Sequence, residues 1–252
     1  MIRRKHGGGW LLFTQDDHAR LSAEIMSLWG GRFFFPDPPD ELLFAISEHD
    51  CGWKETDAGP FLNPRGEPED FTEISPPRQT EIWRRSFEKH AGANPWEAAL
   101  IALHFNKFNE RVLSRKPNKW SLALKDEIEK LVKKTLGVSS VSRLCAQTQK
   151  NLKLLRTGDA ISLALCHGWE TFEVGQVPLE KSGETTVRLQ MTGENAFGIS
   201  PWPFARDGSL RFETAFRRTR AEKFATSGEL IAEMKTAERE KITFTLSPEK
   251  MK

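Results

Sequence analysis

The dipeptide His49-Asp50 is the clearest indication of chemistry in this sequence. It lies in the mainly apolar segment Phe44-Ala-Ile-Ser-Glu-His-Asp-Cys-Gly-Trp53. Imidazole nitrogen beside carboxylate oxygen is a mixed ligand set that Zn, Mn or Fe favours and Ca does not. Neighbouring side chains of a helix point about 100° apart, so one ion takes both only where it lies beside the helix. An isolated dipeptide of this kind is more often a packed core histidine followed by a capping or ion-pairing carboxylate.

Three further polar groups stand where apolar neighbours would normally exclude them. His18 lies in the first turn of a predicted helix, His104 within Ala-Ala-Leu-Ile-Ala-Leu-His-Phe, and Asp159 within Leu-Leu-Arg-Thr-Gly-Asp-Ala-Ile-Ser-Leu. An unpaired imidazole or ionised carboxylate in such surroundings carries a real desolvation cost. One cation where several helices converge would satisfy these groups and the dipeptide together. We therefore predict a metal site with the ligands His18, His49, Asp50, His104 and Asp159.

Helices are expected to position all five groups. Thr14, with Asp17 three residues on, is typical of a helix N-cap, and Gly30-Gly31 ends the helix that follows. A second helix is predicted over residues 41–53, because Leu42, Ile46, His49 and Trp53 recur at steps of four, three and four. Further helices are predicted over residues 79–90, 95–113, 121–136 and 139–166.

Two other segments bear on the site. Residues 57–77 are rich in Pro, Gly and charge, which predicts a long loop of the kind that forms a lid or a pocket wall. His90 stands at a predicted helix end, where an imidazole more often interacts with the helix dipole than with a metal. Whether His90 and His104 complete a second metal site is left open by the sequence.

From Trp169 onward the pattern changes to period two, which is typical of strands. Strands are predicted over residues 185–192, 209–218 and 241–247, with a short helix near residues 228–237. Residues 1–13 predict a short strand, a glycine turn and a second apolar stretch. We therefore expect an α+β fold in two domains. A mainly helical metal-site domain with short N-terminal strands covers residues 1–168, and an antiparallel sheet over residues 169–252 packs on it.

Composition excludes several classes of function. The 252 residues contain 37 Lys and Arg against 35 Asp and Glu, so no broad positive field attracts a nucleic acid and none is expected as a partner. No apolar stretch reaches the ~20 residues of a membrane span, and the N-terminus lacks an apolar export core, which predicts a cytoplasmic protein. The sequence contains no Tyr, which excludes any mechanism that needs a tyrosine hydroxyl as an acid or a nucleophile. The three cysteines without a CxxC motif suggest neither a disulfide framework nor a thiolate zinc knuckle.

The order of these residues resembles a known superfamily. A His, then His-Asp-Cys-Gly, then a His in an apolar helix and a late Asp resemble the HD superfamily of metal-dependent phosphohydrolases. The segments QDDHARLSAEI, AISEHDCGW, LIALHF and LRTGDAISLALC more closely resemble the bacterial family named domain of unknown function 3891. The resemblance implies an α+β fold with a mainly helical HD-like core. It implies His18, His49, Asp50 and Asp159 as the basic mononuclear ligand set, with His104 as an extra ligand or a phosphate-facing imidazole.

The resemblance also implies a function, a metal-dependent phosphohydrolase acting on a small phosphorylated molecule. One or two divalent transition-metal ions would activate water, and Asp50, Lys54 and His104 are the candidate catalytic residues. Lys54 stands one place later than the signature Lys because Trp53 precedes it. Arg78 and Lys107 are further candidates for offsetting the negative charge of the substrate's phosphoryl oxygens. Two alternatives remain, a metal- or ligand-binding sensory protein without turnover and a di-iron oxygenase-like enzyme in which His90 or another residue joins the ligands. The sequence leaves the oligomeric state open.

Overall fold

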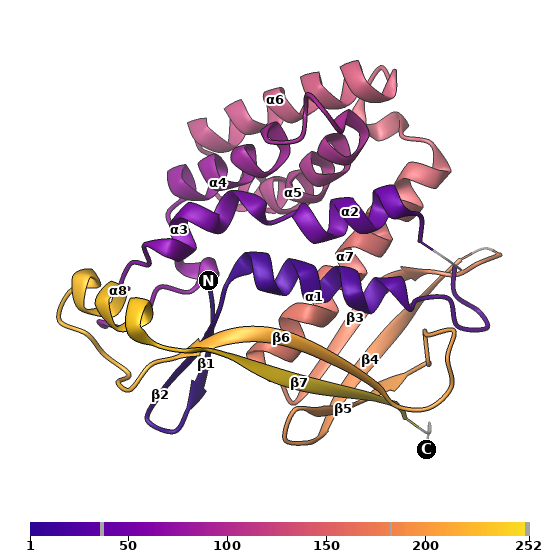
Figure 1. The fold of residues 1–252 in the computed structure, drawn as a ribbon. Helices are drawn as coiled ribbons and strands as arrows, with labels where there is room; N and C mark the ends of the chain where they lie inside the picture. The colour runs from indigo at the N-terminus through magenta and orange to yellow at the C-terminus, as the bar shows by residue number, and fades with distance from the viewer. Residues whose placement is uncertain (36–37, 182, 250–252) are drawn as a thin grey trace.

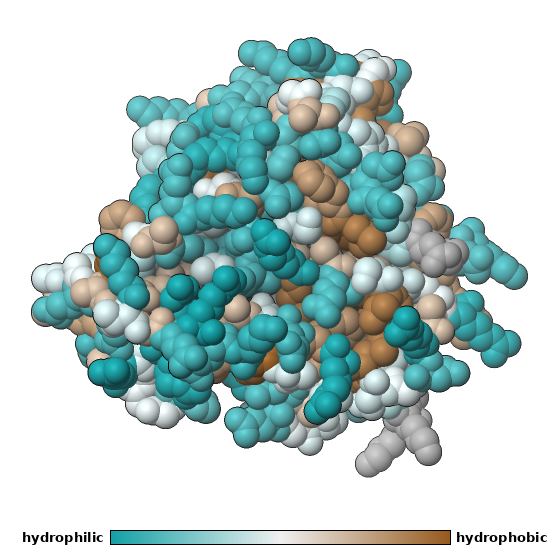
Figure 2. All heavy atoms as spheres, viewed as in Figure 1, coloured by the Kyte–Doolittle hydropathy of each residue, from teal (hydrophilic) through white to brown (hydrophobic). Residues whose placement is uncertain are grey.

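A layer of helices lies over a seven-stranded sheet in this protein (Figure 1). The structure is a computed structural model that describes residues 1–35, 38–181 and 183–249. The outward face of the helical layer is mainly hydrophilic, with scattered apolar patches (Figure 2), so most apolar side chains of the helices face inward. Among the described helices, none combines the length and apolar character that a membrane crossing requires.

Helices and strands follow one another along the chain, with the long segment of residues 59–75 between α3 and α4. The helices are α1 Gln15–Ser27, α2 Asp40–Glu48, α3 Lys54–Ala58, α4 Pro76–Glu88, α5 Pro95–Arg115, α6 Lys119–Leu136, α7 Ala146–His167 and α8 Ser227–Thr236. The strands are β1 Ile2–His6, β2 Gly9–Phe13, β3 Thr171–Pro178, β4 Glu184–Gly193, β5 Ala196–Ser200, β6 Leu210–Arg218 and β7 Arg239–Pro248. The α+β class is thereby confirmed.

The sheet is mixed, which corrects the expected antiparallel sheet. Its order is β1-β2-β6-β7-β5-β4-β3, and β5 pairs with β7 in parallel while the other neighbours are antiparallel. A period-two pattern determines which side chains face the core and leaves the direction of the neighbouring strand undetermined. The N-terminal hairpin joins the sheet through Leu11 opposite Arg218, so strands from both ends of the chain share it. The division of the chain near residue 168 stays a prediction.

Helix α1 connects the sheet to the helical layer. Its predicted cap is confirmed, because the Thr14 hydroxyl accepts a hydrogen bond from the Asp17 amide at 3.0 Å. The Thr214 hydroxyl of β6 donates to the Asp17 carbonyl, and the chain after α1 pairs with the segment before β6 through Trp29 and Phe204. The first turn of α1, which carries His18, is therefore fixed against the sheet.

The segment predicted as a single helix over residues 41–53 is interrupted, which is a correction. Helix α2 ends at Glu48, and Cys51–Trp53 form a 3₁₀ turn before α3. The amide of Gly52 donates to the Ser86 hydroxyl of α4 at 3.0 Å. A Cβ on Gly52 would lie 2.2 Å from the Ile82 carbonyl oxygen, so only glycine allows α4 this close. The break turns Asp50 out of helical register with His49.

Gly158 sets the approach of α7 to α1. A Cβ at this position would lie 2.6 Å from both the Met26 Cγ and the Ser22 Oγ of α1, well inside van der Waals contact. The missing side chain therefore lets the two helix backbones come close. Because Asp159 follows Gly158 directly and His18 lies one turn before Ser22, this contact also determines the spacing of two predicted ligands.

We predict that Gly158→Ala destabilises the protein although Gly158 lies inside a helix. Alanine normally stabilises a helix interior by about 1 kcal/mol relative to glycine, but overpacking of this kind costs about 1–3 kcal/mol. We expect a net loss of up to about 2 kcal/mol in the free energy of unfolding, measured by urea denaturation.

Gly228→Ala is the matched control. Its Cβ would meet only the Thr226 Oγ1 at 3.6 Å, so it should be neutral or stabilise α8 by up to about 1 kcal/mol. Equal effects of the two substitutions would contradict the close approach of α1 and α7.

Candidate metal centre

Two carboxylates and two imidazoles meet where α1, α2 and α7 converge. The Nε2 atom of His18 lies 3.3 Å from an oxygen of Asp50 and 3.3 Å from an oxygen of Asp159. The Nε2 atom of His49 lies 3.4 and 3.6 Å from the same two oxygens. All four side chains are buried. Neither Nε2 atom has a hydrogen-bond partner among the residues that the structure describes, so their lone pairs or protons point into a shared space between the carboxylates.

The remote nitrogens of these two imidazoles are held by other groups. His49 Nδ1 lies 2.7 Å from the Ile46 carbonyl oxygen, which can only accept, so Nδ1 carries the proton. The Ser162 hydroxyl donates to the Asp159 carbonyl at 3.0 Å and therefore accepts from His18 Nδ1 at 2.7 Å. Both rings thus have an Nε2 lone pair available in the neutral state. Metal-ligating histidines typically have this arrangement, with the second nitrogen donating to an outer partner.

The charges within this cluster are strongly coupled. Burial opposes the charged form of His49, but the Asp50 and Asp159 carboxylates outweigh it and raise the His49 pKa to about 9. The pKa of His18 is raised as well, because Asp159 and Asp50 again outweigh burial. Burial alone would raise the pKa of Asp159, but His18 and His49 hold it well below its usual range. Asp159 therefore stays ionised and requires positive charge beside it, which protons on the two rings or a metal ion can supply.

His104 lies at the edge of this cluster. Its Nε2 atom is 3.6 Å from the second oxygen of Asp159, and its ring lies 5.1 Å from the ring of His49. Burial lowers the pKa of His104 to about 3, so the ring is neutral at neutral pH. The donor atoms of His18, His49 and Asp159 lie within 4.8 Å of one another, and this group includes neither Asp50 nor His104.

A cavity of about 640 Å³ opens onto the cluster. His18, Asp50, His104 and Asp159 line its inner end. Phe71 and Thr72, from the loop over residues 57–77, form part of the wall, and β3 closes another side with residues 172–176. The cluster is therefore accessible to a small molecule although its side chains are buried.

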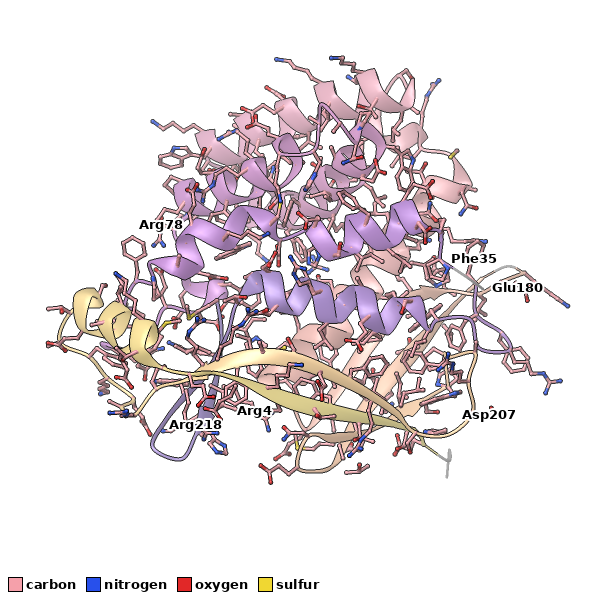
Figure 3. The ribbon with its side chains drawn as sticks, viewed as in Figure 1. Arg4, Phe35, Arg78, Glu180, Asp207 and Arg218 are labelled. Atoms are coloured by element: carbon pink, nitrogen blue, oxygen red, sulfur yellow. The ribbon has the colours of Figure 1, made fainter. Side chains whose placement is uncertain are left out.

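Three of the other residues named from the sequence lie away from the cluster. The Lys54 ammonium contacts Asp16 at 3.0 Å and is half exposed in a different groove. Arg78 pairs with Glu69 at 2.9 Å and lies at the edge of the helical layer (Figure 3). His90 contacts Glu48 at 3.1 Å. In contrast, Lys107 lines the cavity.

Sequence reasoning missed two residues of the site. Ser162 orients His18, because its hydroxyl accepts a hydrogen bond from His18 Nδ1. Arg156 was not identified, although it lines the cavity and lies three residues before Asp159 on α7, a spacing that places both on one helix face. Burial lowers the pKa of Arg156 to about 10, and its guanidinium remains charged at neutral pH.

Comparison with known proteins identifies the family. The family model described as "Protein of unknown function (DUF3891)" matches residues 1–217, so the chain belongs to this family. The match extends from the N-terminal hairpin through all five predicted ligands and most of β6. No curated protein and no solved structure matches the chain.

We predict that the cluster binds a transition metal through Asp159. The protein purified without chelator should contain at least one equivalent of Zn, Mn or Fe, and Asp159→Asn should contain about one equivalent less than the wild type because a neutral amide is a poor ligand. Metal content is measured by mass spectrometry after dialysis. Glu173→Gln, which alters a carboxylate in the cavity wall outside the cluster, should retain the metal. Retention by Asp159→Asn, or no metal in the wild type, would count against the site.

We also predict a pH-dependent effect of metal on stability. The His49 pKa of about 9 in the metal-free protein lies above the ~6.5 of an unfolded chain. Its proton therefore contributes stability fully below about pH 6.5, and the contribution is lost as the pH rises through 9. A bound metal replaces this proton. The gap in melting temperature between zinc-loaded and metal-free protein should widen from about pH 6 to 9, and a constant gap would contradict this linkage.

Proposed function

We propose that this protein is a metal-dependent phosphohydrolase acting on a small phosphorylated molecule. One observation carries the proposal, namely that a single cavity combines the His-Asp cluster with the cationic side chains of Lys107, Arg111 and Arg156. Its volume of about 640 Å³ is in the range of small-molecule sites. The resemblance of the ligand order to the HD superfamily supports the same reaction class.

The cluster fits a transition-metal ion in its donor chemistry. Within the described part of the chain, two buried Nε2 atoms have no hydrogen-bond partner and face the carboxylates of Asp50 and Asp159. This nitrogen and oxygen set suits Zn, Mn or Fe. His18, His49, Asp50 and Asp159 would hold the ion, with His104 beside them. When bound, a divalent ion supplies Lewis acidity towards water and phosphoryl oxygens.

The cations of the cavity supply the second requirement of phosphoryl transfer, which is compensation of negative charge. Arg156 is half-buried and its Nη2 donates to the Leu103 carbonyl at 3.3 Å, which fixes the guanidinium beside the cluster. A fixed cation in a site of low polarity stabilises developing charge more than a solvated one does. In the proposed mechanism Arg156 and Lys107 take the phosphate-binding role that the sequence had suggested for Lys54. Asp50 holds and orients the attacking water as a hydrogen-bond acceptor.

The apolar part of the cavity holds the remainder of the substrate. Trp53, Phe71, Phe105, Phe108 and Phe172 line it, and their rings exclude water and offer flat surfaces. A neutral His104 extends this wall to the cluster without adding charge. The substrate is therefore expected to combine a phosphoryl group with an apolar or planar portion.

A second candidate function is a metal- or ligand-binding protein without turnover. The ion pair between Lys54 and Asp16 outside the cavity favours it, because the signature lysine is then not available to a phosphate. The di-iron alternative requires His90 or another residue to join the cluster, and the His90 ring contacts Glu48 and Cys51 instead. Neither alternative uses the cations of the cavity for catalysis.

We predict that the metal-loaded protein hydrolyses at least one phosphomonoester, phosphodiester or nucleotide in a screen with added Mn or Zn. Arg156→Gln should then lower kcat/KM roughly 10- to 100-fold, because a hydrogen bond to a charged group contributes about 1.5–3 kcal/mol. The metal content should stay unchanged.

Arg78→Gln is the control, since Arg78 is paired with Glu69 outside the cavity, and its kcat/KM should equal that of the wild type. Metal-loaded protein that binds phosphorylated compounds but turns none over would favour the sensory alternative. Activity that persists without metal would refute the proposed mechanism.

A further inference from the structure

A second group of metal-ligating side chains lies on the other side of the segment that carries the His-Asp dipeptide. Glu48, Cys51 and His90 bring a carboxylate oxygen, a sulfur and an imidazole nitrogen within 4.8 Å of one another. His90 Nε2 lies 3.1 Å from Glu48 Oε2 and 3.6 Å from Cys51 Sγ. None of the three takes part in the cluster described above.

The interrupted helix explains how adjacent residues serve two separate groups. Glu48 and Cys51 are three positions apart, a spacing that brings side chains to one face of a helical turn. His49 and Asp50, between them, face the first cluster. The four consecutive residues thus divide into an outer pair and an inner pair with different partners.

The donors of the second group are held in place before any ion binds. Gly52 is fixed to Ser86 of α4 by a hydrogen bond of 3.0 Å, and this holds Cys51 against the end of that helix. The His90 amide donates to the Phe87 carbonyl at 3.2 Å, and the His90 carbonyl accepts from the Asn94 amide at 2.8 Å. Cys51 and His90 are both buried. A binding site on such fixed elements needs little rearrangement.

Lys89 supplies the positive charge that balances the Glu48 carboxylate in this group. Its ammonium lies 2.6 Å from the same Glu48 oxygen that contacts His90. The Lys89 side chain is 46% exposed, so it can leave for solvent at little cost, whereas Glu48 is largely covered. A divalent ion entering from this side replaces the ammonium, and Cys51 releases its thiol proton to solvent on coordination.

We propose that Glu48, Cys51 and His90 form a second metal site, distinct from the His18 cluster, for a borderline-soft divalent ion such as Zn²⁺ or Co²⁺. One sulfur, one nitrogen and one oxygen ligand are the donor types that zinc takes in proteins, and hard ions such as Mg²⁺ and Ca²⁺ avoid sulfur. Thiolate and carboxylate together balance the charge of the ion. Three protein ligands leave one position of a tetrahedral site open to solvent on the Lys89 side.

Cobalt titration of the metal-free full-length protein tests this site separately from the first. Cobalt bound to a thiolate gives a charge-transfer absorption in the near ultraviolet, which nitrogen and oxygen ligands alone do not give. The wild type should bind two equivalents of Co²⁺, and the thiolate absorption should accompany one of them. Cys51→Ser should abolish this absorption and leave one equivalent. Asp159→Asn should keep the absorption and lose the other equivalent.

Two further variants secure the interpretation. Cys145→Ser removes the exposed cysteine and should leave the absorption unchanged. Glu48→Gln, which keeps the size of a partly exposed side chain, should weaken cobalt binding at this site at least tenfold, since loss of an outer partner alone typically costs about 10–100-fold. A wild type without the absorption, an absorption that survives Cys51→Ser, or unchanged affinity in folded Glu48→Gln would overturn the second site. None of these results bears on hydrolysis at the first cluster.

Discussion

The compensation of buried negative charge is the constraint on which the centre of this protein depends. Asp50 and Asp159 lie in a region from which side chains exclude most water, and an isolated ionised carboxylate is strongly unfavourable there. The balancing positive charge comes from protonated imidazoles of His18 and His49, or it would come from a metal ion that these imidazoles bind. Protons and metal therefore compete for the same nitrogen atoms. The raised pKa values of both rings and the proposed affinity of the cluster for a divalent ion would have the same origin.

The sheet and the helical layer meet at this charge cluster through α1. Its first turn carries His18 and is held to β6 by the hydrogen bond from Thr214 to the Asp17 carbonyl. Its middle packs against α7 at Gly158, one residue before Asp159. A change in how α1 lies on the sheet therefore also changes the geometry of the ligands. This coupling gives the sheet a role beyond closing one wall of the cavity with β3.

The interruption after α2 has the largest consequence for chemistry. In a continuous helix His49 and Asp50 would point about 100° apart, and one ion could contact both only at an awkward angle. The turn at residues 49–53 brings the imidazole and the carboxylate to the same space. It also directs Glu48 and Cys51 towards His90. The close contact of Gly52 with α4 maintains both arrangements, so one backbone irregularity supports the centre and the proposed second site.

The sequence by itself determined most of the local secondary structure and the residues that are candidates for metal ligands. The cap at Thr14, most helices, the strands at residues 185–192, 209–218 and 241–247, and the five buried polar groups all follow from patterns within a few residues. Strands β3 and β5 were not separately identified, because β3 carries a bulge after Val174 and β5 is only five residues long. Only the tertiary structure decided the partners of those groups. It separated Lys54 and His90 from the cluster, brought Arg156 and Ser162 to it, and joined the N-terminal hairpin to the C-terminal strands. Backbone geometry acts over a few residues and is visible in the sequence, whereas the convergence of distant side chains depends on how whole elements pack.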